Sequence, residues 1–146
     1  MRILAIDYGQ KRTGLAVTDP LQLIANGLST VATKDLEKFV LDYVQQESVE
    51  RIIVGHPQQM NGEDSENMRR ITPFVNRLRK LLPETPIEFF DERFTSVMAH
   101  RTILESGIGR KARQNKAIVD EIAATIILQD WMEGRRFSSS VHQQPL

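Results

Sequence analysis

The chain has 146 residues, of which 40% are hydrophobic, and these values suit one domain with one core. Basic and acidic residues number 19 each, so the net charge gives no indication of a nucleic-acid partner. The absence of cysteine excludes disulfides and thiolate chemistry. Neither a signal-peptide pattern nor an apolar run near the roughly 20 residues of a membrane span occurs, so we expect a cytoplasmic protein with no membrane partner.

The first third of the chain predicts three strands followed by a helix. An apolar run that ends at Asp7 is typical of a strand buried on both faces. Residues 15–17 and 22–31 can form two more strands, the first of them antiparallel to the opening strand because the connection is short. Thr33 is a plausible N-cap for a helix through Gln46, whose apolar side chains recur at helical spacing.

The rest of the chain alternates strands with helices. The expected elements are a strand over 51–54, a helix over 68–82, a strand over 87–90, a helix over 95–107 and a last helix over 118–133. Pro73 removes a backbone donor, so a kink or a late helix start is expected there. Gly134 can end the last helix, and residues 137–146 are expected to form a disordered tail. The pattern predicts one α/β domain, residues 1–136, with a mixed sheet covered on both faces.

Acidic residues occur where these elements begin or end. Asp7 ends the first strand, the pair Asp91 and Glu92 ends the fifth, and Asp120 lies near the start of the last helix. If the first and fifth strands are neighbours, their acids converge at one edge of the sheet. Any single one of these acids can also be structural, as a turn former, a helix-dipole partner or, beside Arg93, an ion-pair partner.

Together, such carboxylates would repel one another unless a cation binds between them. Oxygen ligands without sulfur or nitrogen favour Mg²⁺ or Mn²⁺ over zinc. Two such ions, about 3.5–4 Å apart, could activate a water and stabilise the leaving oxygen of a phosphodiester. The acidic residues therefore predict a metal-dependent nuclease.

A glycine-rich turn follows the first strand. Gly9 and Gly14 enclose polar residues, and the pattern that begins at Asp7 is typical of a metal or phosphate site, where Arg12 could hold a phosphate. A plain hairpin is the structural alternative. The pattern occurs in RNase H-like nucleases and in the actin, heat-shock ATPase and sugar kinase group. The chain is about half as long as a two-lobed ATPase requires, which favours the nucleases.

A basic segment, residues 109–116, precedes Asp120. It carries four positive charges and no negative one, on Arg110, Lys111, Arg113 and Lys116. Such side chains can follow a phosphate backbone, although a solvated loop is the alternative. No aromatic residue lies among them, so we expect contact with the backbone and shape of a nucleic acid and not with particular bases.

Several segments together resemble the YqgF-like (RuvX-like) family of pre-16S rRNA nucleases, also described as Holliday junction resolvases. The segments are Asp7-Tyr8-Gly9 with Arg12 and Gly14, Thr18-Asp19, Val54-Gly55-His56-Pro57 with Asn61-Gly62, Asp91-Glu92-Arg93-Phe94-Thr95-Ser96, and Asp120-Glu121-Ile122-Ala123-Ala124 leading into Ile127-Leu128-Gln129. The resemblance covers about residues 1–133. Thr18 stands where serine is common, and His56 stands where the family more often has an apolar residue.

The resemblance implies an RNase H-like three-layer α/β/α fold with a five-stranded mixed sheet. It also implies a cytoplasmic, metal-dependent nuclease that matures the 5′ end of pre-16S rRNA, in contact with ribosomal assembly intermediates. Asp7, Asp120 and one acid of the Asp91–Glu92 pair, with Glu92 preferred, would stand at the catalytic positions. Three alternatives stay open: a nuclease of branched DNA, a non-catalytic RNA-binding assembly factor, and a small ATP-binding relative of the actin group.

Overall fold

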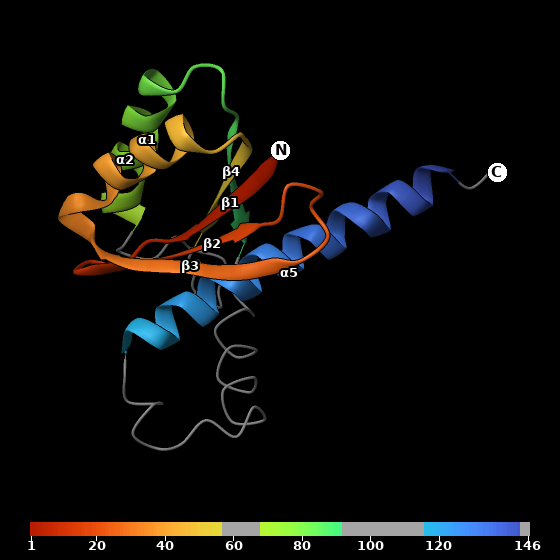
Figure 1. The fold of residues 1–146 in the computed structure, drawn as a ribbon, viewed down its shortest axis with the longest axis horizontal. Helices are drawn as coiled ribbons and strands as arrows, with labels where there is room; N and C mark the ends of the chain where they lie inside the picture. Colours follow the sequence, from red (N-terminus) through yellow and green to blue (C-terminus); the bar gives the residue numbers. More distant parts are fainter. Residues whose placement is uncertain (57–67, 92–115, 144–146) are drawn as a thin grey trace.

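A five-stranded mixed sheet forms the centre of the computed structural model, which describes residues 1–56, 68–91 and 116–143 (Figure 1). The elements are β1 (Arg2–Asp7), β2 (Arg12–Thr18), β3 (Ala25–Ala32), the 3₁₀ turn η1 (Thr33–Asp35), α1 (Leu36–Gln46), β4 (Val49–His56), α2 (Met68–Leu81), β5 (Ile87–Asp91) and α5 (Lys116–Gln143). None of the helices within the described ranges is long and apolar enough to cross a membrane.

The order of strands across the sheet is β3-β2-β1-β4-β5. β1 pairs antiparallel with β2, and β2 with β3, whereas β1, β4 and β5 run parallel. The carboxyl ends of the parallel strands, at Asp7, His56 and Asp91, therefore lie at one edge. The expected convergence of the acids assumed that the first and fifth strands are neighbours in the sheet. This assumption is wrong, because β4 lies between β1 and β5 and separates them by roughly 10 Å.

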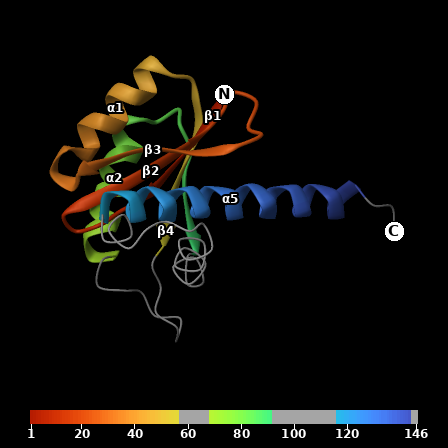
Figure 2. The same cartoon turned by 60° about the horizontal axis from the view of Figure 1, so that its bottom comes forward.

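Helices cover both faces of the sheet, as predicted. α1 and α2 lie on one face and α5 on the other (Figures 1 and 2). Residues of β1 alternate between the two cores: Leu4 and Ile6 pack beneath α1 and α2, while Ile3 and Ala5 pack beneath α5. All four are fully buried, which confirms the prediction of a central strand covered on both sides. The members of the α5 core are Ile3, Ala5, Ala16, Ile53, Ala124, Ile127, Leu128 and Met132.

Some predicted boundaries were wrong. Thr33 lies in η1, and α1 begins at Leu36, so Thr33 is not the N-cap of α1. α2 already includes Met68, five residues before Pro73, which excludes a late start after the proline. α5 continues past Gly134 to Gln143, because a glycine in a helix costs only about 1 kcal/mol relative to alanine and does not itself end the helix.

Other predictions concern residues outside the described ranges or stay predictions. The predicted helix over 95–107 and the loop with Asn61-Gly62 lie outside the described residues. The division into a domain of residues 1–136 and a tail of residues 137–146 stays a prediction, although α5 gives residues up to Gln143 a helical backbone.

Candidate active site

Asp7 is the last residue of β1 and lies on the sheet face that α5 covers. Side chains alternate along a strand, and Ile3 and Ala5 pack against α5, so Asp7 has the same orientation. The Asp7 side chain is half-buried. Gly14 on β2 lies directly opposite, because the two Cα atoms are partners in the antiparallel ladder. Gly14 therefore presents no side chain on this face beside Asp7.

The main chain of α5 passes directly over Gly14. A Cβ atom added to Gly14 would overlap the backbone carbonyl of Asp120 and lie 3.0 Å from the Asp120 Cβ. Since Gly14 and Asp7 are paired on this face, the close approach brings the predicted acids Asp7 and Asp120 together. Gly14 was predicted as a turn residue. It lies within β2 instead, where its small size admits the helix.

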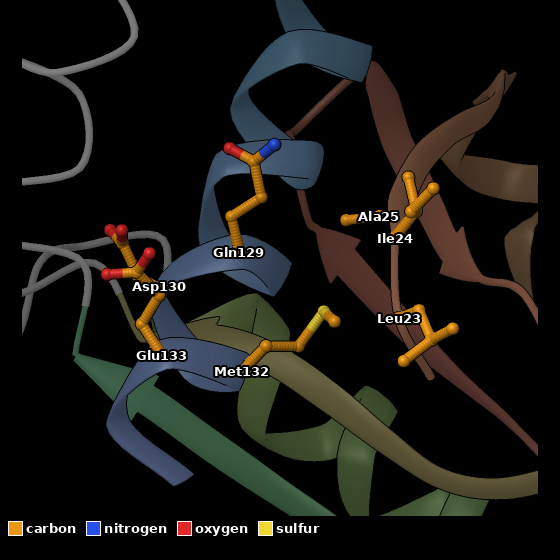
Figure 3. Close-up of a pocket in the computed structure, with 7 residues that line it drawn as sticks. All are labelled: Leu23, Ile24, Ala25, Gln129, Asp130, Met132 and Glu133. Carbon is orange, nitrogen blue, oxygen red and sulfur yellow. The ribbon is translucent and has the colours of Figure 1, made fainter. Parts of the chain in front are cut away.

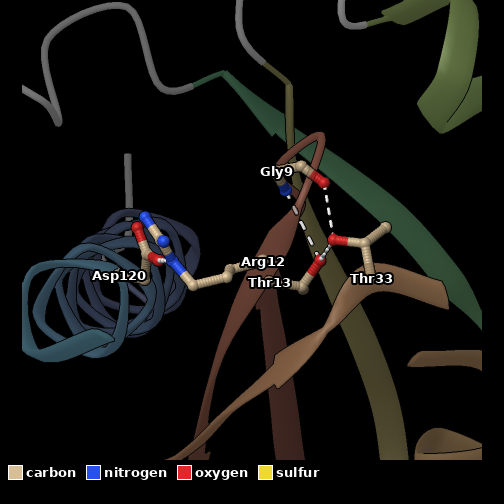
Figure 4. Close-up of polar contacts among 5 residues, drawn as sticks. All are labelled: Gly9, Arg12, Thr13, Thr33 and Asp120. Atoms are coloured by element: carbon tan, nitrogen blue, oxygen red, sulfur yellow. Dashed lines mark hydrogen bonds and ion pairs between the residues drawn. The ribbon is translucent and has the colours of Figure 1, made fainter. Parts of the chain in front are cut away.

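Charges of both signs meet at this point (Figure 4). Burial and, next, the negative charge of Asp120 raise the pKa of Asp7 from 3.8 to about 7. Arg12 at the start of β2 reaches across to α5, where its Nε lies 3.3 Å from Asp120 Oδ2. Among the described residues, no ion pair joins Asp7 itself to a cation. Of the described charged side chains at this point, Asp7 and Asp120 are acidic and Arg12 is basic.

These residues fit a divalent cation. The carboxylates of Asp7 and Asp120 lie close enough for the charge of Asp120 to raise the pKa of Asp7. Both carboxylates offer hard oxygen ligands, and a cation between them would remove their repulsion. Within the described ranges, no group of three metal-ligating side chains occurs. Glu92 and the side chain of Asp91 lie outside those ranges, with Asp91 placed only by its backbone as the last residue of β5. Asp7 and Asp120 are thus the two predicted acids that the structure brings together.

Thr33 contacts the candidate site, a role that the sequence pattern did not predict. Its hydroxyl donates a hydrogen bond to the Gly9 carbonyl over 2.7 Å, and its backbone N–H donates to the Lys11 carbonyl over 3.0 Å. A threonine before an apolar helical stripe has the same local pattern as an N-cap, so nothing in the sequence distinguished the two roles. Gly9 itself must be glycine, since a Cβ there would overlap the carbonyl of Arg12.

The chain matches the RuvX family, described as "Holliday junction resolvase", over residues 1–134. It belongs to this family. Relatives named "Putative pre-16S rRNA nuclease" include that of Phocaeicola vulgatus, 65% identical over 136 residues, which cover 93% of this chain and 98% of the relative. The relative from Porphyromonas gingivalis is 58% identical over 132 residues, 90% of this chain and 96% of the relative. The RuvX chain is therefore a nuclease.

Solved structures show the same fold. "T. thermophilus RuvC in complex with Holliday junction substrate" superposes with a TM-score of 0.56 at 18% identity, covering 87% of this chain and 92% of that one. "Thermus thermophilus RuvC structure" gives a TM-score of 0.50 at 13% identity over the same shares of the two chains. The five-stranded sheet and these neighbours confirm the predicted RNase H-like fold of the RuvX chain.

Most of the predicted basic segment of this RuvX chain lies outside the described residues. Arg110, Lys111 and Arg113 fall there. Lys116 is placed only by its backbone, as the first residue of α5 and four positions before Asp120. One helical turn, about 6 Å along the axis, therefore separates the end of the basic segment from the candidate site.

A hollow lies farther along α5, between that helix and the turn from β2 to β3 (Figure 3). Its volume is about 440 Å³, and Met132 points toward the exposed Leu23 and Ile24. Asp130 and Glu133 supply its charges, and burial and, next, the Glu133 charge raise the pKa of Asp130. Because its described lining is acidic and apolar, this hollow would repel phosphate.

Proposed function

We propose that this RuvX nuclease uses divalent metal ions to hydrolyse phosphodiester bonds near the 5′ end of pre-16S rRNA, in the cytoplasm. The observation that carries the site assignment is the approach of Asp120 to Asp7 across Gly14, at the carboxyl edge of the parallel strands. The rRNA substrate is supported by the name of relatives that are up to 65% identical.

Asp7, Asp120 and Glu92, with Asp91 as the alternative to Glu92, would hold the ions. When bound, Mg²⁺ or Mn²⁺, in one or two copies, supplies an activated water and stabilises the leaving oxygen. The protein supplies the carboxylates, one of which keeps a raised pKa while no cation is near. Gly14 lets the main chain of α5, and with it Asp120, approach Asp7 closely.

Positive side chains would bind the nucleic acid around this centre. The Arg12 side chain, 43% exposed, presents a planar guanidinium next to Asp120, where it can donate two hydrogen bonds to one phosphate group. Arg110, Lys111, Arg113 and Lys116 would follow the backbone on the side of the α5 N-terminus. Ribosomal assembly intermediates that contain the precursor are the proposed partners.

The first experiment compares cleavage of a 5′-extended 16S rRNA fragment by the parent, Asp7→Asn and Asp42→Asn. An amide is a poor metal ligand, so Asp7→Asn is expected to lose cleavage in Mg²⁺ or Mn²⁺ by at least a hundredfold, about 3 kcal/mol of transition-state stabilisation. Asp42 is an exposed aspartate of α1 and provides the matched control, which is expected to cut like the parent. Equal cleavage by the Asp7 and Asp42 variants would refute the site.

Branched DNA is the second candidate substrate. The family description names Holliday junctions, and the solved RuvC neighbour is in complex with one. A direct competition between the rRNA fragment and a four-way DNA junction of equal length distinguishes the two substrates. We expect the parent to cut the RNA at least tenfold faster, and faster cleavage of the junction would assign the activity to DNA.

A further inference from the structure

Gly9, Thr13 and Thr33 form a closed ring of three hydrogen bonds beside the candidate active site (Figure 4). The Gly9 N–H donates to Thr13 Oγ1 over 3.4 Å, and the two threonine hydroxyls lie 2.9 Å apart. The Thr33 hydroxyl then donates to the Gly9 carbonyl over 2.7 Å. The ring begins at the N–H of Gly9 and ends at the carbonyl of Gly9, which follows Asp7 by two residues.

The protons of this ring have a single arrangement. A carbonyl only accepts, so the one hydroxyl proton of Thr33 points to Gly9. Thr13 must therefore be the donor between the two hydroxyls, and its oxygen accepts the Gly9 N–H. Every donor of the ring has one acceptor. Thr13 is fully buried, so removal of the Thr33 hydroxyl would leave its donor without a partner at a place that the solvent does not reach.

The ring fixes the main chain on both sides of Gly9, a residue type with wide conformational freedom. Thr33 holds the turn at a further point, since its backbone N–H donates to the Lys11 carbonyl over 3.0 Å. The turn that these bonds hold begins after Asp7 and ends at Arg12. Both of those side chains interact with Asp120 at the site.

We infer that Thr33 is a positioning residue of the nuclease: through Thr13 and Gly9 it holds the turn that aims Asp7 and Arg12 at Asp120. The inference rests on the proposed metal-dependent function. Thr33 has no charge, and its hydroxyl is engaged by the turn, so it acts through the residues of the turn and not on the substrate. Outer partners that orient a ligand commonly change metal affinity or activity by about 10–100-fold.

The test uses the full chain with three substitutions. Thr33→Val keeps the shape and removes the hydroxyl, whereas Thr33→Ser keeps the hydroxyl. Thr18→Val is the control, because the Thr18 hydroxyl likewise bonds to the main chain, accepting the Ile3 N–H over 2.9 Å, at the opposite end of β2 from the site. Thr18 is fully buried, whereas Thr33 is half-buried, so the control is at least as demanding on the fold. Hydrogen exchange of the Gly9 amide and Mn²⁺ affinity by calorimetry are measured for each, together with the cleavage rate at saturating Mn²⁺.

We expect Thr33→Val to speed exchange of the Gly9 amide and to weaken Mn²⁺ binding by about tenfold, with Thr33→Ser close to the parent. Thr18→Val should lower the melting temperature while keeping the Mn²⁺ affinity of the parent. Equal Mn²⁺ affinity in the two valine variants would overturn the positioning role alone. If the parent binds no Mn²⁺, the proposed function is overturned, and the positioning role with it. Hydrogen exchange of the Gly9 amide would in that case still show whether Thr33 holds the hydrogen-bonded ring.

Discussion

Replacing Asp7 by asparagine should stabilise the metal-free protein, although it removes a proposed ligand. The pKa of Asp7 is raised from 3.8 to about 7 by burial and, next, by the Asp120 charge, so the folded state binds the Asp7 proton more tightly than the unfolded state does. The charged form of Asp7 consequently costs stability. This cost is absent below about pH 4, grows as the pH rises, and is complete above about pH 7.

The size of the effect follows from the same shift. Each pKa unit corresponds to 1.36 kcal/mol, so a rise to about 7 sets a ceiling of about 4 kcal/mol. Asp7 is half-buried and not fully enclosed, so solvent screening reduces the expected gain to about 1–3 kcal/mol at pH 8. In a chain of this length each kcal/mol moves the melting temperature by about 2–4 °C. The gain should fall to less than half at about pH 5.

The assay is thermal unfolding in a chelating buffer at about pH 5 and about pH 8, with the parent, Asp7→Asn and the exposed control Asp42→Asn. Addition of Mn²⁺ at the higher pH should raise the melting temperature of the parent and leave that of Asp7→Asn unchanged. An increase in the melting temperature of Asp7→Asn over the parent that is absent at the higher pH, or equal at both pH values, would refute the electrostatic account of Asp7. A similar gain for Asp42→Asn would show a general charge effect instead.

Other substitutions test the packing and the basic segment. Gly14→Ala should cost at least about 2 kcal/mol and weaken cleavage, because its Cβ would overlap the main chain of α5. Gly134→Ala, where a Cβ would meet nothing within 4 Å, should instead stabilise by up to about 1 kcal/mol, and melting curves compare the two. Trp131→Phe should cost about 1–2 kcal/mol with cleavage kept, since the indole N–H donates to Glu88 Oε1 over 2.6 Å and the phenylalanine ring has no donor that can replace it. Alanine at all four cations of residues 109–116 should weaken RNA binding and flatten its dependence on salt, which filter binding across a salt series measures.

Local patterns predicted the layers of the fold because burial follows periodicity. The apolar run before Asp7 matched a strand covered on both faces, and the stripe that begins at Leu36 matched a helix packed on one face. The order of the parallel strands could not be read in this way. Nothing in the residues of β5 records that it pairs with β4 and not with β1.

The candidate site was predictable only in part, because its acids come from elements far apart in the chain. Asp7 and Asp120 stood out by their position at the ends of elements, and the structure places both beside Gly14. The role of Gly14 was hidden, because the sequence pattern of a turn glycine is the same as that of a glycine beneath a helix. Thr33 was similarly hidden, since its partner Gly9 is 24 positions away.

The position of the metal ions tests the central claim most directly. Anomalous diffraction from crystals soaked in Mn²⁺ would locate one or two ions without any assumption about the substrate. The account predicts that Asp7 and Asp120 both ligate an ion at the carboxyl edge of β1, with a third carboxylate from the Asp91–Glu92 pair. Mn²⁺ bound elsewhere on the protein, with Mn²⁺-dependent cleavage intact, would contradict it.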